Sequence, residues 1–263
     1  MDFLLDQISI LIPAFLAGII VLSTHVPLGQ EVIKRGIIFL DLAIAQIASF
    51  GVVLAQLLSN FLFHNDHEGI EDGNKLFVQV VAIVTAVLGA TILYGLRNAS
   101  AKVQECLIGV FFILAATGSI LLLSKDPYAS DHLRDILVGQ ILWVEYQQLI
   151  VVAIIYSAIL FLWFFHRSKL GGFGFYPLFA IAITFSTQLV GIYLVFASLI
   201  IPALVSINFK QAYRYAYIVG LLGYGVGLIL SAIVDLPSGA MIVWSLAIIG
   251  GMTFWFTRAI NQH

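Results

Sequence analysis

The sequence predicts an all-α integral membrane protein, a polytopic bundle of about eight or nine transmembrane helices. Of its 263 residues, 61% are hydrophobic and only 10% are charged, whereas soluble domains carry about 25% charged residues. The mean hydropathy is +1.06. Several separate stretches have the roughly 20 apolar residues that a helix needs to cross a bilayer. Most of the protein surface must therefore face lipid.

Nine apolar stretches reach the length of a span or come close to it. The two stretches between residues 173 and 209 are short and barely separated, so one could be a broken or re-entrant segment and eight spans remain open. No stretch resembles a soluble domain or a linker, so we expect a single transmembrane domain over residues 1–263. The nine stretches are 8–28, 37–58, 76–96, 106–124, 147–165, 173–191, 192–209, 218–234 and 240–257.

The connections between these stretches differ in charge. The connection at 64–74 is acidic, whereas those at 30–36, 97–104, 166–171 and 210–214 are basic. The positive-inside rule places basic connections in the cytoplasm, which with nine spans puts the N-terminus outside and the C-terminus inside. The basic residues are Lys34, Arg35, Arg97, Lys102, Arg167, Lys169, Lys210 and Arg214.

Composition also excludes several classes of protein. A net charge of -2 gives no electrostatic attraction to nucleic acid. Cys106 is the single cysteine, so an intrachain disulfide and a multi-cysteine metal cluster are both excluded. Residues 1–7 contain two aspartates and no basic residue, unlike a cleaved signal peptide, so we expect the first apolar stretch to remain as a span. An ATP-binding loop of the G-x-x-x-x-G-K-[ST] type does not occur in the sequence.

Polar side chains inside the spans are few, and such residues are often functional. Asp41 lies about one turn inside the second stretch, and Gln46 lies about 7 Å deeper, offset by roughly 140° around the helix. One helix alone therefore does not chelate an ion with both. Asp41 has the alternative role of an ion-pair partner of Lys34 or Arg35, and Gln46 that of an interhelical hydrogen bond. His25 is interpreted as a packing residue.

Two loop clusters have the chemistry of ion sites. His64 and His67 lie among carboxylates in the acidic connection and could receive a metal at the entrance, although a solvated acidic loop is the interpretation we prefer, because such clusters are common in exposed loops. Asp131 and Asp135 are separated by one helical turn, with Arg134 between them. Intramembrane prenyltransferases need two Asp-rich motifs, so this single motif is a weak signal for such an enzyme.

Four stretches, in order, resemble the permease subunits of the zinc/manganese/iron class of ATP-binding-cassette importers. The first combines Pro-Leu-Gly at 27–29 with 41–51, and the second opens a span at 105–109. The others are Leu-Val-Gly-Gln-Ile-Leu at 137–142 and Gly-Ile-Tyr-Leu-Val-Phe-Ala-Ser-Leu-Ile-Ile-Pro-Ala at 191–203, the last followed by 235–243. The resemblance extends over nearly the whole chain.

The resemblance implies a fold like that of the vitamin B12 importer permease, assembled as a homodimer in the bacterial cytoplasmic (inner) membrane. A cytoplasmic ATPase would bind the ATP, and an extracytoplasmic binding protein would deliver a divalent metal, zinc first, with manganese or iron as alternatives. The permease itself would hold no covalently bound cofactor and would not be an enzyme.

The resemblance also assigns residues, with two departures. The family carries an Asp and a His on the second span as metal ligands. Here Gln46 stands at the His position and Asp41 one residue before the Asp position, so these two are the expected metal residues. The family's cytoplasmic coupling helix follows the fifth span, where this chain has only 166–172. Arg167 and Lys169 are therefore expected to contact the ATPase.

Two other functions remain open. A stand-alone ion-coupled carrier would need more charged groups at mid-depth than Asp41 supplies. An intramembrane prenyltransferase-like enzyme would need a second Asp-rich motif. The sequence therefore favours the metal importer.

Overall fold

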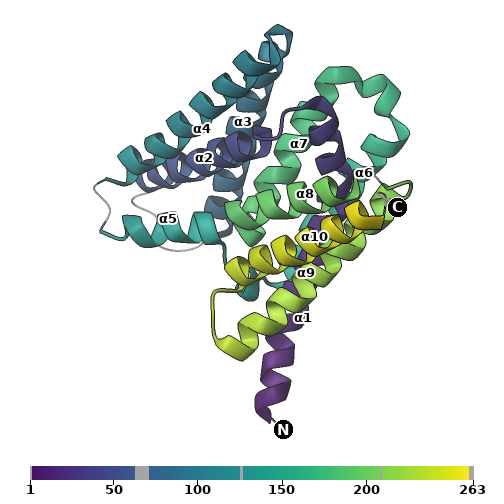
Figure 1. Cartoon of the computed structure of the whole chain (residues 1–263). Helices are drawn as coiled ribbons and strands as arrows, with labels where there is room; N and C mark the ends of the chain where they lie inside the picture. Colours follow the sequence, from purple (N-terminus) through teal and green to yellow (C-terminus); the bar gives the residue numbers. More distant parts are fainter. Residues whose placement is uncertain (1, 63–70, 125–126, 208, 261–263) are drawn as a thin grey trace. The chain divides into compact units, whose positions relative to one another are not determined.

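The computed structural model describes residues 2–62, 71–124, 127–207 and 209–260 (Figure 1). Within these ranges it contains ten α-helices, two short 3-10 helices and no strand. The α-helices are α1 (Asp2–Arg35), α2 (Leu40–Leu62), α3 (Glu71–Gly95), α4 (Ala101–Leu123), α5 (Ala129–Val138), α6 (Tyr146–Phe165), α7 (Arg167–Val190), α8 (Ile192–Ser206), α9 (Ala212–Val234) and α10 (Ser238–Ile260). The 3-10 helices are η1 (Leu96–Asn98) and η2 (Ile141–Trp143).

In the described part of the chain, eight helices are long and apolar enough to cross a membrane. The predicted all-α membrane fold is therefore confirmed. The short stretch predicted at 192–209 is α8, an apolar helix of 15 residues, separated from α7 by Gly191 alone. Eight long helices together with α8 account for the predicted range of eight to nine spans.

The chain forms two compact units that alternate along the sequence. Unit 1 consists of Met1–Ile38, Leu137–Phe165 and Gln188–His263, and unit 2 consists of Phe39–Ile136 and His166–Thr187. Neither unit is a continuous piece of chain, so no linker in the sequence marks a boundary between them.

Close helix contacts at glycines hold unit 1 together. The aromatic ring of Tyr224 on α9 covers Gly18 on α1, and Gly220 on α9 faces Leu22 on α1. A methyl group on Gly220 would come within 2.7 Å of the Leu22 side chain. A later residue of α1 therefore contacts an earlier residue of α9, which shows that the two helices are antiparallel.

Helices α9 and α10 also run antiparallel, side by side (Figure 1). Gly223 faces Leu246, and a methyl group on Gly227 would meet the backbone of Ile242 at 2.5 Å. Small residues four apart let helix backbones approach closely in membranes. Gly223 and Gly227 have this spacing, and both lie at a close contact between α9 and α10.

These directions place the two ends of unit 1. The Gln30 amide of α1 donates to the Ser206 hydroxyl of α8 at 3.5 Å, so the C-terminal ends of α1 and α8 meet. The N-terminal end of α9 and the C-terminal end of α10 lie at the same end, which we call the basic end because it holds Lys34, Arg35, Lys210 and Arg214. The N-terminal end of α1 lies at the opposite end.

Helix α2 is central in unit 2, where it contacts both α3 and α4. Methyl groups on Gly51 of α2 and Gly89 of α3 would collide with Thr85 and Ile47 on the facing helix, at 2.9 and 2.7 Å. Phe50 lies against Gly118 of α4 in the same way. The first turns of α2 are buried on nearly all sides, as expected of a helix with apolar residues all round.

Aromatic side chains join the end of α3 to the start of α7 in unit 2. The ring of Tyr94 lies 5.0 Å from that of Phe173 and 5.2 Å from that of Tyr176, both edge to face. The Arg97 guanidinium lies 4.0 Å above the Tyr94 ring. Such aromatic and cation–π contacts add about 0.5–1.5 kcal/mol each beyond area burial, so they hold α7 firmly against α3.

Candidate functional site

Asp41 lies in the first turn of α2, because that helix begins at Leu40. The sequence interpretation placed it a full turn inside a span starting at 37, and the structure corrects this depth. Gly36 has a positive φ of 69° and ends the α1 conformation, so residues 36–39 form a turn rather than the start of the span. A carboxylate in a first turn is favoured by the positive end of the helix dipole.

The side chain of Asp41 is buried and has no hydrogen-bond partner at either carboxylate oxygen. Its relative exposure is 1%, and Ile44 and Ala45, which share its face of α2, are equally buried. Arg35, one of its two suggested ion-pair partners, donates to Glu31 at 2.9 Å. A buried carboxylate without hydrogen bonds is costly, and this makes Asp41 the strongest candidate for an ion-binding residue.

Gln46 is also buried, with 6% exposure, further along α2. It lies five residues after Asp41, so the two side chains leave the helix about 140° apart. They do not form a chelating pair within one helix. No group of three or more His, Cys, Asp or Glu side chains suited to a metal ion occurs in the part of the chain that the structure describes.

The four remaining predicted site residues lie at the acidic connection and at the start of α7. His64 and His67 lie outside the described residues. Arg167 and Lys169 belong to the first turn of α7, and only their place in the helix is described. The proposal that they contact an ATPase stays a prediction.

His25 is completely buried in α1. Its Nδ1 atom lies 2.9 Å from the carbonyl oxygen of Val21, while its Nε2 atom has no hydrogen-bond partner. A carbonyl accepts only, so Nδ1 carries a proton and donates this bond. The bond to its own helix fits the packing role that the sequence suggested.

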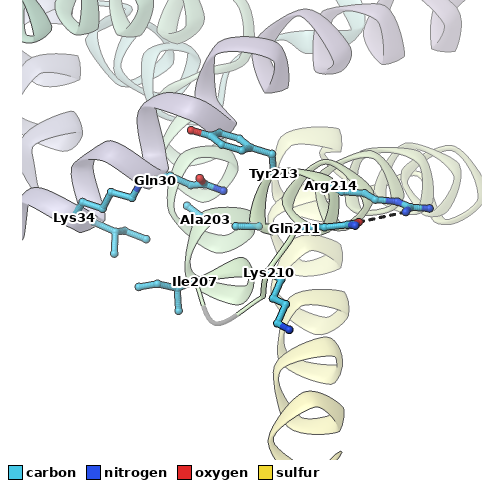
Figure 2. Close-up of a pocket in the computed structure, with 10 residues that line it drawn as sticks. Gln30, Lys34, Ala203, Ile207, Lys210, Gln211, Tyr213 and Arg214 are labelled. Carbon is cyan, nitrogen blue, oxygen red and sulfur yellow. Dashed lines mark hydrogen bonds between the residues drawn. The ribbon is translucent and has the colours of Figure 1, made fainter. Parts of the chain in front are cut away.

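The basic end of unit 1 contains a pocket that the sequence interpretation did not find. Its volume is about 430 Å³, and Figure 2 shows side chains from α1, the end of α8 and the start of α9 around it. None of its ten lining residues is acidic. They are Gln30, Ile33, Lys34, Ala203, Ile207, Lys210, Gln211, Ala212, Tyr213 and Arg214.

Three cations, two amides and a phenol give this pocket the chemistry of an anion-binding surface. Arg214 donates to the Gln211 side chain at 3.3 Å, which orients the guanidinium, while no carboxylate neutralises it within the lining. The lining also includes the apolar side chains of Ile33 and Ile207. An acidic, partly apolar protein segment would fit both features.

With the geometry established, comparison with known proteins identifies the family. The model of the ABC 3 transport family matches residues 7–180 and 167–257. The chain belongs to that family. It is thus a multi-pass membrane permease of an ATP-binding-cassette transport family, and both α2 and the basic pocket lie in the matched segments.

A solved structure has the same fold. A chain in "PsaBC from Streptococcus pneumoniae in complex with Fab" is 21% identical, with a TM-score of 0.72 and 95% of each chain covered. At this identity the likeness concerns the fold. No curated protein sequence matches.

Proposed function

We propose that this chain is the transmembrane permease subunit of an ATP-driven importer of a divalent transition metal, with zinc as the first candidate. Membership of the ABC 3 transport family and the four family-like stretches support it. The observation that carries the metal assignment is Asp41, a buried carboxylate in a membrane helix with neither oxygen hydrogen-bonded.

A charged side chain at the centre of a span costs about 2.5–3.5 kcal/mol on the insertion scale, and this is the upper limit for Asp41 in the first turn of α2. A cation passing the helix would offset that cost. In a homodimer α2 occurs twice around the symmetry axis, so two copies of Asp41 could converge on one ion. Gln46 would then offer a carbonyl oxygen deeper along the path, a weaker zinc ligand than imidazole. Weak binding suits a conduit, because a tightly held ion would not leave.

The basic end of unit 1 faces the cytoplasm in this proposal, in agreement with the positive-inside rule. Asp235, which ends α9, would then face the outside. The test replaces Asp235 or Lys210 with cysteine in a Cys106→Ser background. An impermeant thiol reagent applied to spheroplasts should label the first position and not the second. The reverse pattern would overturn the orientation.

The partner ATPase would dock at this cytoplasmic end. Two surfaces compete for it: the start of α7 with Arg167 and Lys169, expected from the sequence, and the pocket between Lys34, Lys210 and Arg214. The pocket is the stronger candidate because its lining combines three cations with apolar side chains and contains no carboxylate. An extracytoplasmic binding protein would deliver the metal at the other end. Alternating access would draw its energy from ATP, since a metal ion that binds both conformations equally does not change the equilibrium between them.

Metal content of cells that lack this permease tests the proposal. Cells grown under zinc, manganese or iron limitation should lose one metal selectively, and the permease gene should restore it only together with a functional neighbouring ATPase. Restoration without an ATPase would instead support a stand-alone carrier. Unchanged content of all three metals would refute the metal assignment.

A further inference from the structure

The chain crosses between unit 1 and unit 2 four times, and each crossing lies beside a break in helical structure. Three of the breaks contain a glycine with positive φ. These are Gly36, Gly139 and Gly191, with φ of 69°, 74° and 80°. The crossings themselves follow Ile38, Ile136, Phe165 and Thr187.

The glycines with positive φ coincide with the crossings between the units. Every glycine with positive φ in the described part of the chain lies within four residues of a crossing. At the fourth crossing, α6 ends at Phe165 and α7 begins at Arg167. Left-handed backbone is disfavoured for residues with a side chain and freely available to glycine. The sequence therefore has its greatest backbone freedom where one unit continues into the other.

Two of these glycines touch each other within unit 1. A methyl group on Gly139 would collide with the backbone of Val190, and one on Gly191 would collide with the backbone of Gly139. A third glycine, Gly239 at the start of α10, lies against the carbonyl oxygen of Val138, which a methyl group would approach to 2.6 Å. Two crossings therefore leave unit 1 from a single point where backbone meets backbone.

The remaining glycine break is open. A methyl group on Gly36 would meet no atom within 4 Å. Its conformation is therefore set by the backbone alone and not by packing. Hinges in proteins are a few residues at the ends of elements that absorb changes in φ and ψ.

We propose that these breaks form a hinge by which unit 2 turns relative to unit 1, with the contact of Gly139 and Gly191 as the pivot and Gly36 as a free joint. The inference rests on the backbone geometry and holds for any cargo. The hinge would provide a conformational change for the proposed transport cycle. Its test does not depend on the metal assignment.

Distances between spin labels test the hinge in the permease alone, reconstituted in lipid nanodiscs. Ile233 and Trp255 in unit 1, and Leu76 and Leu121 in unit 2, are each about two-thirds exposed or more and accept a label in a Cys106→Ser background. Dilution with unlabelled protein removes signals between copies. The pairs within a unit should give narrow distance distributions, and the pair Ile233 with Leu121 a broad or two-peaked one.

Matched glycine substitutions assign the motion to the hinge. Gly36→Ala adds a methyl group without a collision but penalises positive φ, so the ratio of the two distance populations should shift roughly tenfold. Gly109→Ala in α4 adds a methyl group in equally open space and without positive φ, so it should leave the ratio unchanged. If the pair across the units is as narrow as the pairs within them, or if both variants behave alike, the hinge is refuted.

Discussion

Replacement of Asp41 by Asn separates an ion-binding role from a structural one, because the two roles predict opposite changes in stability. The amide has almost the same shape as the carboxylate and no charge. An ion-pair partner of Lys34 or Arg35 would leave a charge unpaired when replaced, and the protein would become less stable. A carboxylate kept for transport costs stability, and its removal should make the protein more stable and inactive.

The expected magnitude follows from the surroundings of Asp41. An ionised carboxylate at the centre of a spanning helix costs about 2.5–3.5 kcal/mol, which is the upper limit for Asp41 in the first turn. Neither oxygen has a hydrogen bond to offset this cost. The helix dipole stabilises the charge in the first turn of α2 by only about 0.3–1 kcal/mol. Because Asp41 lies near the end of the helix, Asp41→Asn should therefore raise the free energy of unfolding by at most about 3 kcal/mol, the limit for a fully ionised side chain.

The assay combines denaturant unfolding of the purified permease with ATP-dependent zinc uptake into vesicles that contain its ATPase. Ser49→Ala is the matched control, since Ser49 is buried on the same helix and donates only to the carbonyl of Ala45, at 2.9 Å. It should retain uptake. Normal uptake with lowered stability in Asp41→Asn would show that Asp41 is a structural ion-pair partner and that the metal path lies elsewhere.

Two further predictions concern the same transport cycle. Gln46→His should bind zinc more tightly and slow its release, because imidazole is the better ligand; zinc retained on the washed protein measures this, and equal retention would remove Gln46 from the path. Lys210→Ala with Arg214→Ala should lower ATPase binding and metal-stimulated ATP hydrolysis, measured on the purified complex, by more than Arg167→Ala with Lys169→Ala does. A larger loss in the second pair would place the docking surface at the start of α7.

The long membrane helices and their order could be predicted from the sequence because each depends on a local run of apolar residues, whereas the polar helix α5 lies outside these runs and was not predicted. The close approach at Gly223 and Gly227 is also visible in the sequence, as two small residues four apart within one apolar stretch. The start of α2 was not, because the apolar residues after Gly36 extend the hydrophobic run beyond the helix itself. Average hydropathy over a segment does not show that Gly36 adopts a left-handed backbone conformation.

The basic pocket could not be predicted either. Lys34 and Lys210 are far apart in the sequence and come together only because α1 and α8 end at the same place. Each lysine alone is an ordinary member of a basic connection. The burial of both oxygens of Asp41 without a partner likewise depends on three-dimensional packing, whereas its presence in a hydrophobic segment was visible at once.

The long-range contacts of α1 have a consequence for synthesis of the protein. The partner of Gln30 is Ser206, 176 residues later, and the partner of the Ser23 carbonyl is Tyr217, 194 residues later. At about 5–20 residues per second, a ribosome needs roughly 10–40 s to produce them. During that time α1 holds Gln30 and the buried His25 without the helices that cover them, whereas α2, α3 and α4 meet as soon as they are made. We expect α1 to stay beside the insertion machinery until α9 arrives, and ribosome-arrested chains ending before and after α9 should differ in crosslinking of α1 to that machinery.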